Sequence, residues 1–329
     1  GGSVTVIQGI TVTEAREIAL DVYKANALDL AKSARDLVDE RVSKITDKIV
    51  TEIHSRKAEA LNSFGDPDFQ YKLYESSIAF ARSGDADLEK LLVDLMVERA
   101  SENTRSTKQL ILNEAVEVVG KVSQQQHCII VSVFLARHSR FKTGDYKEFL
   151  SRLETLWIKY FSSLNKSDLS YKHLEYLGCM TSSIGTMDIF KILKGHYGGF
   201  FIKGFKEEDI PEKFRTEAMK VCCQHLFEKN FLQYSCLDEE VLSVEMKNKG
   251  VAVEAHQEIL GHYRQTLMAN SDIQKKLESD LPSSNIIFEK WKETPLKSCT
   301  LTSVGRALAI SFLHSHGHSG FNFDTWLVE

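Results

Sequence analysis

The spacing of apolar residues along the chain predicts a protein built mainly from α-helices. In much of the first half, apolar residues recur every three or four positions, which is the period of a helix with one buried face. These patterns are separated by short polar turns that contain Gly, Pro, Ser or Asp. They predict five successive helices that form a bundle or a solenoid-like layer, over residues 68–82, 86–101, 104–119, 123–137 and 146–164.

A long stretch before these helices contains neither proline nor glycine. It runs from Val12 to Phe64, and Thr11 and Glu14 stand in front of it in the spacing of a capping box. We expect either one helix, which would reach about 75 Å, or two abutting helices. Its second half has apolar residues in steps of four and three, which suit either a coiled-coil seam between two copies of the chain or packing within one domain: Val38, Val42, Ile45, Ile49 and Ile53.

The first residues have the composition of a strand. Residues 4–7 are all β-branched, yet no hairpin partner follows them. Val4 and Val6 would therefore pair either with a segment upstream of this sequence or with the same strand in other copies of the chain. The opening Gly-Gly-Ser without methionine resembles a linker remnant.

The second half is predicted to be less regular. Five glycines within residues 185–204 indicate loops, and helices resume over residues 211–229, 238–249, 251–281 and 301–313. Residues 174–179 and 301–308 resemble the helix end and the strand-to-helix entry of winged-helix modules, so we expect a small α+β module there. The pattern predicts four regions: a linker and strand (1–10), a long oligomerisation helix (11–64), a helical bundle (65–165) and a loop-rich helical C-terminal domain (166–329).

Composition narrows the class of protein. The 329 residues are 43% hydrophobic and 26% charged, which is typical of a globular protein, and the net charge of −5 gives no general attraction to nucleic acid or anionic membranes. The six cysteines are scattered without a CxxC pair, which favours reduced, buried thiols in a cytoplasmic protein. No apolar run approaches the roughly 20 residues that span a membrane, and no signal-peptide pattern is visible.

Three clusters are candidate functional sites, each with a structural alternative. Alternate histidines in an extended segment face one side and suit a metal, or else form a surface turn: His314, His316 and His318. Cations at the end of an apolar helix suit a nucleic-acid phosphate, or else complement the helix dipole: Arg137, Arg140 and Lys142. Aromatic residues among glycines suit a partner-contact surface, or else anchor a loop to the core: Tyr197, Phe200, Phe201 and Phe205.

Three segments resemble a family of uncharacterised bacterial proteins, and the likeness covers most of the chain. They are residues 10–26, residues 66–70 with 81–85, and residues 171–179. Members of that family carry a β-prone stretch before a long helix. The resemblance implies an accessory function such as stress response or defence against phage, and it assigns no catalytic residue.

These observations favour a non-enzymatic interaction protein. No GxSxG, HExxH or GxxxxGK[ST] motif occurs, and the sequence indicates no cofactor. We expect a homo-oligomeric scaffold, sensor or regulator of a bacterial stress or anti-phage pathway, with a protein partner whose identity the sequence leaves open. The alternatives are a nucleic-acid-binding regulator that uses Arg137, Arg140 and Lys142, and a metal-dependent hydrolase that uses the three histidines.

Overall fold

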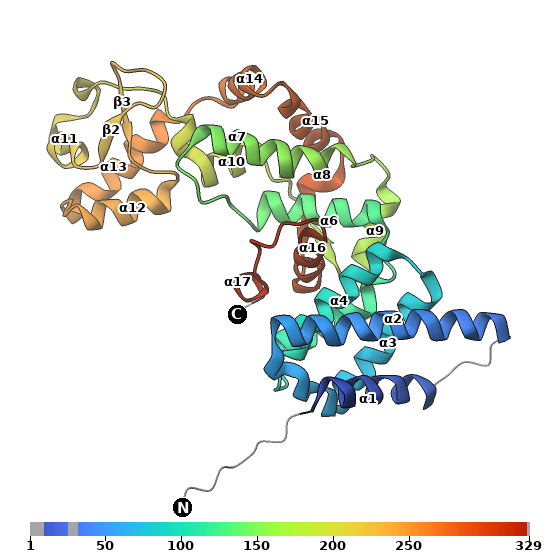
Figure 1. The fold of residues 1–329 in the computed structure, drawn as a ribbon. Coiled ribbons are helices and arrows are strands. Elements are labelled where there is room, and N and C mark those ends of the chain that lie inside the picture. The colour runs from blue at the N-terminus through green and yellow to red at the C-terminus, as the bar shows by residue number, and fades with distance from the viewer. Residues whose placement is uncertain (1–9, 26–31, 328–329) are drawn as a thin grey trace, which may run out of the picture. The chain divides into compact units, whose positions relative to one another are not determined.

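The architecture is mainly α-helical, as the sequence predicts. A computed structural model describes residues 10–25 and 32–327, and within them the β-structure is limited to two small two-stranded sheets (Figure 1). No helix in this described part of the chain is long and apolar enough to cross a membrane.

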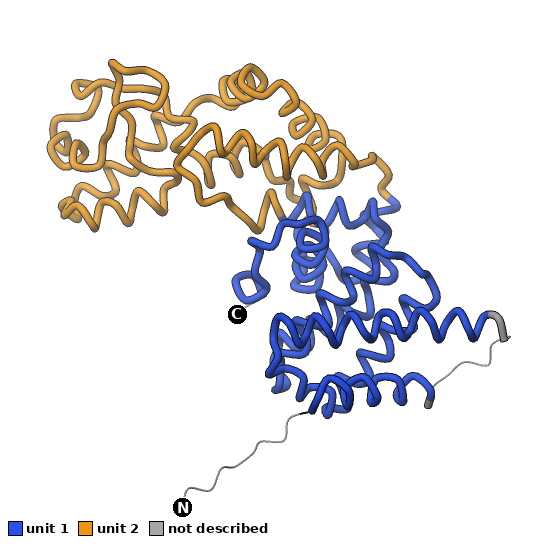
Figure 2. Tube along the Cα trace, viewed as in Figure 1, with its two compact units in different colours: residues 1–134, 169–182, 300–329 blue, residues 135–168, 183–299 orange. Residues whose placement is uncertain are grey.

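The chain divides into two compact units, each built from segments that are distant in sequence (Figure 2). Unit 1 comprises residues 1–134, 169–182 and 300–329, and unit 2 comprises residues 135–168 and 183–299. This division differs from the four contiguous regions predicted above. Periodicity along the chain detects helices, but it carries no information about which distant helices share a core.

Unit 1 contains most of the N-terminal helices and the C-terminal ones. Their bounds are α1 (Val12–Ala25), α2 (Lys32–Arg56), η1 (Ala58–Gly65), α3 (Pro67–Ser83), α4 (Ala86–Ala100), α5 (Thr107–Val119), most of α6 (Gln124–Arg137) and of α9 (Asp168–Tyr176), β1 (Met180–Ser182), most of β4 (Cys299–Leu301), α16 (Ser303–Ser315) and α17 (Phe323–Trp326).

Unit 2 contains shorter elements. They are α7 (Tyr146–Arg152), η2 (Leu153–Ile158), α8 (Lys159–Ser162), α10 (Ile189–Tyr197), η3 (Gly198–Phe201), η4 (Glu207–Asp209), α11 (Glu212–Met219), β2 (Cys222–Gln224), β3 (Leu232–Tyr234), α12 (Glu239–Asn248), α13 (Val253–Thr266), α14 (Asn270–Asp280), η5 (Pro282–Ser284), α15 (Asn285–Glu293) and η6 (Pro295–Ser298). The helix predicted over residues 211–229 is wrong in its second half, because Cys222–Gln224 pair antiparallel with Leu232–Tyr234.

The predicted long N-terminal helix is two helices. Figure 1 shows α1 and α2 side by side and antiparallel, so the two-helix alternative is the observed one. Val42, Ile45, Ile49 and Ile53 are all buried within the chain, where α1, α3 and α4 pack on α2, and Val38 is partly buried. The coiled-coil seam predicted from these residues is therefore wrong. Val4 and Val6 lie outside the described residues.

Helix α4 is the centre of unit 1. It begins at Asp85, whose carboxylate accepts the backbone N–H groups of Asp87 (2.8 Å) and Leu88 (3.1 Å), as expected for an N-cap. From Leu91 to Ala100 every residue is buried, including Asp94, Glu98 and Arg99. A helix buried on all sides has no polar face, so its charged side chains need partners from the surrounding helices.

Each buried charge of α4 has such a partner. Glu89 accepts Lys44 (3.2 Å) and Lys48 (2.8 Å) from α2. The remaining acids pair with cations from several segments: Asp94 with Arg56 (3.0 Å), and Glu98 with Lys57 (2.7 Å) and Lys108 (2.8 Å). These pairs connect α4 to α2, to the residue that follows α2 and to α5.

Arg99 has the most complete set of contacts. Its guanidinium donates to Asn113 Oδ1 (2.7 Å), Glu102 O (3.0 Å) and Asp68 Oδ2 (2.7 Å), and it lies over the Phe69 ring. The side chain is fully buried, so all of these bonds replace contacts with water.

We expect Arg99→Ala to lower the free energy of unfolding by about 3–5 kcal/mol, because it removes the cation from a buried network and leaves a cavity. Urea denaturation followed by circular dichroism measures the change. Lys90→Ala is the control, since the Lys90–Asp87 pair is about half exposed and should contribute below about 1 kcal/mol. Equal effects of the two substitutions would contradict the prediction.

The two segments that resemble parts of winged-helix modules, residues 174–179 and 301–308, contact each other in unit 1. Thr302 Oγ1 donates to the carbonyl of Gly178 (2.6 Å), and Thr302 N donates to the carbonyl of Cys179 (3.1 Å). A Cβ at Gly305 would overlap the Cys179 carbonyl, so the start of α16 requires glycine there. In the described residues, the hairpin that a winged helix also needs is absent from this place: β1 pairs with the distant β4, and β2–β3 belongs to unit 2.

Candidate functional site

The aromatic residues predicted to form a partner surface are buried. Tyr197, Phe200, Phe201 and Phe205 are each at most 5% exposed. Phe149 contacts the first three, with ring centroids 4.8, 5.1 and 6.1 Å away. The prediction of an exposed surface is wrong, because these rings anchor a glycine-containing segment to the core of unit 2, the alternative that the sequence left open.

The predicted nucleic-acid cations have partners within the chain. Arg137 donates to the carbonyl of Lys297 (2.5 Å) and lies over the Trp291 ring. Arg140 pairs with Asp238 (2.8 Å) and Glu240 (3.0 Å). Neither Arg137 nor Lys142 has an acidic ion-pair partner among the described residues, and Lys142 also has no hydrogen-bond partner there. A phosphate site built from all three is not supported by this geometry, since Arg140 is already compensated by two acids and Arg137 is engaged with the Lys297 carbonyl and the Trp291 ring.

The three histidines do not converge on a metal site. His314 contacts Asp94 (3.0 Å), whereas His316 Nδ1 lies 2.9 Å from the carbonyl of Phe312 and its ring packs against the Phe312 ring. Among the described residues, no group of three or more His, Cys, Asp or Glu is placed to hold a metal ion. The predicted metal site at His314, His316 and His318 is wrong because α16 continues to Ser315, so the segment is not extended.

His314 instead completes the charge network of α4. Its Nδ1 faces Asp94 Oδ2 (3.0 Å) and its Nε2 faces the carbonyl of Phe321 (2.5 Å). Both partners are hydrogen-bond acceptors, so both contacts are hydrogen bonds when the ring is protonated. Burial acts to lower the pKa of His314, but the hydrogen bond and charge of Asp94, together with the Phe321 carbonyl, raise it above its ordinary value.

The raised pKa of His314 predicts how the loss of stability caused by His314→Gln depends on pH. The stabilisation is fully present below the unfolded-state pKa of about 6.5 and is lost as pH rises through the folded-state pKa. We expect the substitution to cost about 2 kcal/mol at pH 5.5 and much less at pH 9. Urea denaturation at both pH values measures the costs, with His54→Gln, at an exposed position, as the control. A cost for His314→Gln that is independent of pH would contradict the protonated ring.

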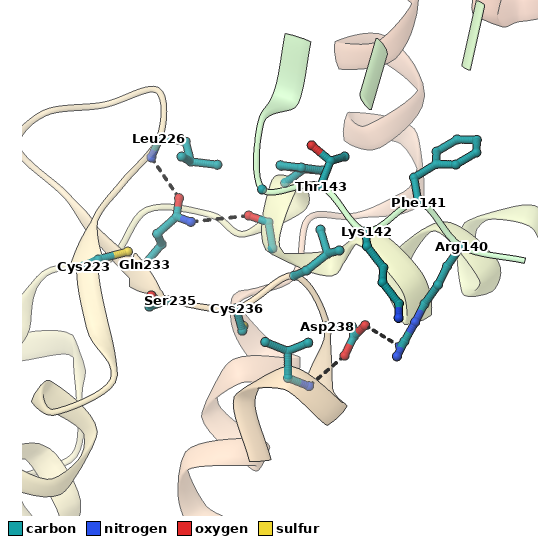
Figure 3. A pocket seen from close by; sticks show the side chains of 15 residues that line it. Arg140, Phe141, Lys142, Thr143, Cys223, Leu226, Gln233, Ser235, Cys236 and Asp238 are labelled. Atoms are coloured by element: carbon teal, nitrogen blue, oxygen red, sulfur yellow. Dashed lines mark hydrogen bonds and ion pairs between the residues drawn. The ribbon is translucent and has the colours of Figure 1, made fainter. Parts of the chain in front are cut away.

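A pocket in unit 2 with a volume of about 530 Å³ is the candidate binding site (Figure 3). Four parts of unit 2 form it: the loop of residues 140–144 between α6 and α7, the η3 turn, the β2–β3 hairpin, and the start of α12. Its lining is mainly apolar and includes Phe200, Leu226, Leu237 and Val241. A few convergent polar groups in an apolar hollow are typical of a binding site.

Hydrogen bonds between distant residues hold the walls of this pocket. Gln233 is 4% exposed, and its side chain accepts from Leu226 N (2.8 Å) and donates to Gly199 O (3.5 Å), as Figure 3 shows. Gly199 N donates to Leu237 O (2.8 Å), and a Cβ at Gly199 would overlap the Cys236 carbonyl. The pocket therefore exists before any ligand binds, which lowers the cost of binding.

The polar groups of the pocket have structural partners. The buried Asp238 caps α12 by accepting Val241 N (2.9 Å) and pairs with Arg140. Burial raises the pKa of the Cys223 and Cys236 thiols, so both are protonated near neutral pH and are poor nucleophiles. The arrangement suits binding more than nucleophilic or acid–base chemistry.

Sequence analysis did not identify this pocket. Its residues come from positions 140–144, 199–200 and 223–241, and the sequence analysis names three of them, Arg140, Lys142 and Phe200, but for other sites. The local signal available was the alternation of the charged Arg140 and Lys142 with Phe141 and the β-branched Thr143, which is typical of an extended segment.

Comparison with known proteins identifies a family. A family model described as ":-like" matches residues 9–327. The chain belongs to this family. The match covers nearly the whole chain, as the sequence resemblance does, and its description names neither a ligand nor a reaction. No curated protein and no solved structure matches the chain.

Proposed function

We propose that the protein is a non-enzymatic interaction protein that binds a segment of a partner protein in the pocket of unit 2. The observation that carries the proposal is the preformed apolar pocket with Leu226 at its edge. The Leu226 side chain lines the pocket and is 49% exposed, so covering it would gain about 1 kcal/mol, roughly half of what full burial of a leucine contributes. A partner side chain that covers Leu226 gains this burial, which is how anchor residues stabilise interfaces.

The charges around the pocket support binding over catalysis. Asp238 is committed to the cap of α12 and to Arg140, and Thr143 Oγ1 donates to Glu148 Oε2 (2.6 Å). General acid–base catalysis needs a group that reaches the substrate with a pKa near the working pH. Both of these groups are instead occupied in holding the pocket walls.

The biological setting is part of the same proposal. We expect a scaffold, sensor or regulator of bacterial stress response or defence against phage, and this expectation rests on the sequence resemblance alone. The cytoplasmic location expected from the scattered cysteines fits this setting, and none of the six cysteines, all of which lie in the described residues, forms a disulfide.

Substitution of Leu226 tests the binding role of the pocket. We expect Leu226→Asp to weaken the complex with a partner at least tenfold, because it places a charge where an apolar side chain docks. The control is Val253→Asp, which changes another exposed apolar residue of unit 2 outside the pocket.

Proteins captured from an extract of the source organism identify candidate partners, and calorimetry with the purified pair gives the dissociation constants. A partner bound by the unmodified chain and by Val253→Asp, but lost with Leu226→Asp, supports the proposal. Equal binding by all three forms would refute the pocket as the binding site.

Self-association is a separate part of the proposal. The β-branched residues Val4 and Val6 are the remaining basis for it, since the α2 seam is buried within the chain. Light scattering of the full chain at tens of micromolar should give a mass above that of one chain, and deletion of residues 1–9 should reduce it. A monomeric mass for the full chain contradicts self-association.

A further inference from the structure

We propose that the partner segment binds in an extended conformation, as a β-strand added along residues 140–144, and that it carries an acidic side chain that pairs with Lys142. This inference rests on the proposed function of the pocket in unit 2. It names the class of ligand: a peptide with an apolar anchor and a neighbouring aspartate or glutamate.

Residues 140–144 have the features of an unpaired edge strand. Along this segment exposed and buried residues alternate, with Arg140, Lys142 and Gly144 exposed and Phe141 and Thr143 buried. This period of two is that of an extended chain. The segment lies outside any helix or sheet, and all five residues line the pocket.

The backbone of this segment is almost free of hydrogen bonds. Phe141 N–H donates to the hydroxyl of the buried Tyr197 (3.0 Å), which fixes one side of the segment to the core. Within the described residues, the other four N–H groups and all five carbonyls have no partner. In an extended chain, the N–H and C=O groups of one residue point to one side and those of the next residue point to the other. Because Phe141 N–H points to Tyr197, the backbone groups of Arg140, Lys142 and Gly144 point away from Tyr197.

A peptide strand is the ligand that satisfies such an edge. Unpaired backbone groups in a row are a template for another strand, and strand addition is a common mode of peptide recognition. The main-chain bonds supply affinity, and a pocket beside the strand selects a side chain. Here the cavity of about 530 Å³, with Phe200, Leu226 and Val241 in its lining, is that pocket.

The charged residues that line the pocket indicate which charge the bound peptide carries. Arg140 is compensated by Asp238 and Glu240, whereas Lys142 has no ion-pair partner among the described residues. Figure 3 shows both side chains extending toward the same side of the pocket. Lys142 is therefore the one member of this charged group without an opposite charge beside it in the described part of the chain, and an acidic residue of the ligand can pair with it.

The segment is also held rigid before binding. Thr143 Oγ1 accepts Asp145 N (3.1 Å) and donates to Glu148, while Phe141 packs against Tyr197 with ring centroids 5.9 Å apart. Fixing alternate side chains in the core presents the remaining edge in one conformation. The peptide alone then loses conformational freedom on binding.

An octapeptide array tests the inference with the full-length protein. The probes alternate apolar and polar residues and differ only in one polar position, which is Asp in one series and Lys in the other. We expect the Asp series to bind at least about fivefold more tightly in fluorescence polarisation, a ratio that falls at high salt. Lys142→Glu should remove or invert this preference, and Lys191→Glu, at an exposed position of unit 2 outside the pocket, should leave it unchanged.

N-methylation of the best peptide tests strand addition itself. Methyl groups on alternate backbone nitrogens of one edge should weaken binding at least about tenfold, while methylation of the other edge should have little effect. Binding that is insensitive to methylation, or that weakens equally at every position, would overturn the strand-addition mode. Identical effects of Lys142→Glu and Lys191→Glu would overturn the selection for an acid.

The result separates this inference from the proposed function. If a protein partner is lost with Leu226→Asp but no octapeptide binds, the extended-peptide mode is wrong and the interaction role of the pocket stands. If no partner depends on Leu226 and no octapeptide binds, both are wrong.

Discussion

The charged residues buried on α4 are the constraint on which unit 1 depends. A helix enclosed on every side must satisfy each of its ionised groups inside the protein, because an unpaired buried charge costs several kcal/mol. Glu89, Asp94, Glu98 and Arg99 take their partners from the helices packed around α4. A buried ion pair adds little net stability compared with an apolar pair, but it tolerates only one register between the two helices. Apolar packing brings the helices together, and we infer that these ion pairs favour the register in which each charge meets its partner.

Local chemistry made part of the fold predictable. Asp66 and Asp85 cap the starts of α3 and α4, and Pro67 is the first residue of α3. These starts were predictable because a carboxylate cap and a proline in the first turn act within a few residues. The buried side of α2 was also recognisable from the spacing of Val42 to Ile53. What covers that side was not, because a periodic apolar seam looks the same whether another chain or α1, α3 and α4 pack on it. The strand at Cys222–Gln224 depends on its partner Leu232–Tyr234, which a helical pattern does not reveal.

The pocket of unit 2 could not be predicted from the sequence, because residues far apart in the chain form its walls. Arg140 and Asp238 are 98 positions apart, and Gln233 and Gly199 are 34 apart, so their contacts exist only in the folded chain. The same holds for His314 and Asp94, which are separated by 220 positions. The sequence placed His314 correctly in a histidine-rich segment, but the acid that determines its protonation lies in the centre of another helix. Aromatic residues among glycines were equally ambiguous, since the Phe200 ring suits either a surface or a core until its neighbours, such as Phe149, are known.

The division of unit 1 between the two ends of the chain has a consequence for synthesis on the ribosome. Helix α16 is buried from Ala307 to Leu313 against α4 and α5, and Ser311 Oγ donates to the carbonyl of Leu91 (3.3 Å). Until these residues have left the ribosome, the apolar side of α4 that α16 covers is exposed, and Asp94 has no contact with His314. The whole of unit 2 is translated during that interval. The nascent N-terminal helices therefore expose a hydrophobic surface for most of translation, which makes this stage the one at which chaperone binding or aggregation competes with folding.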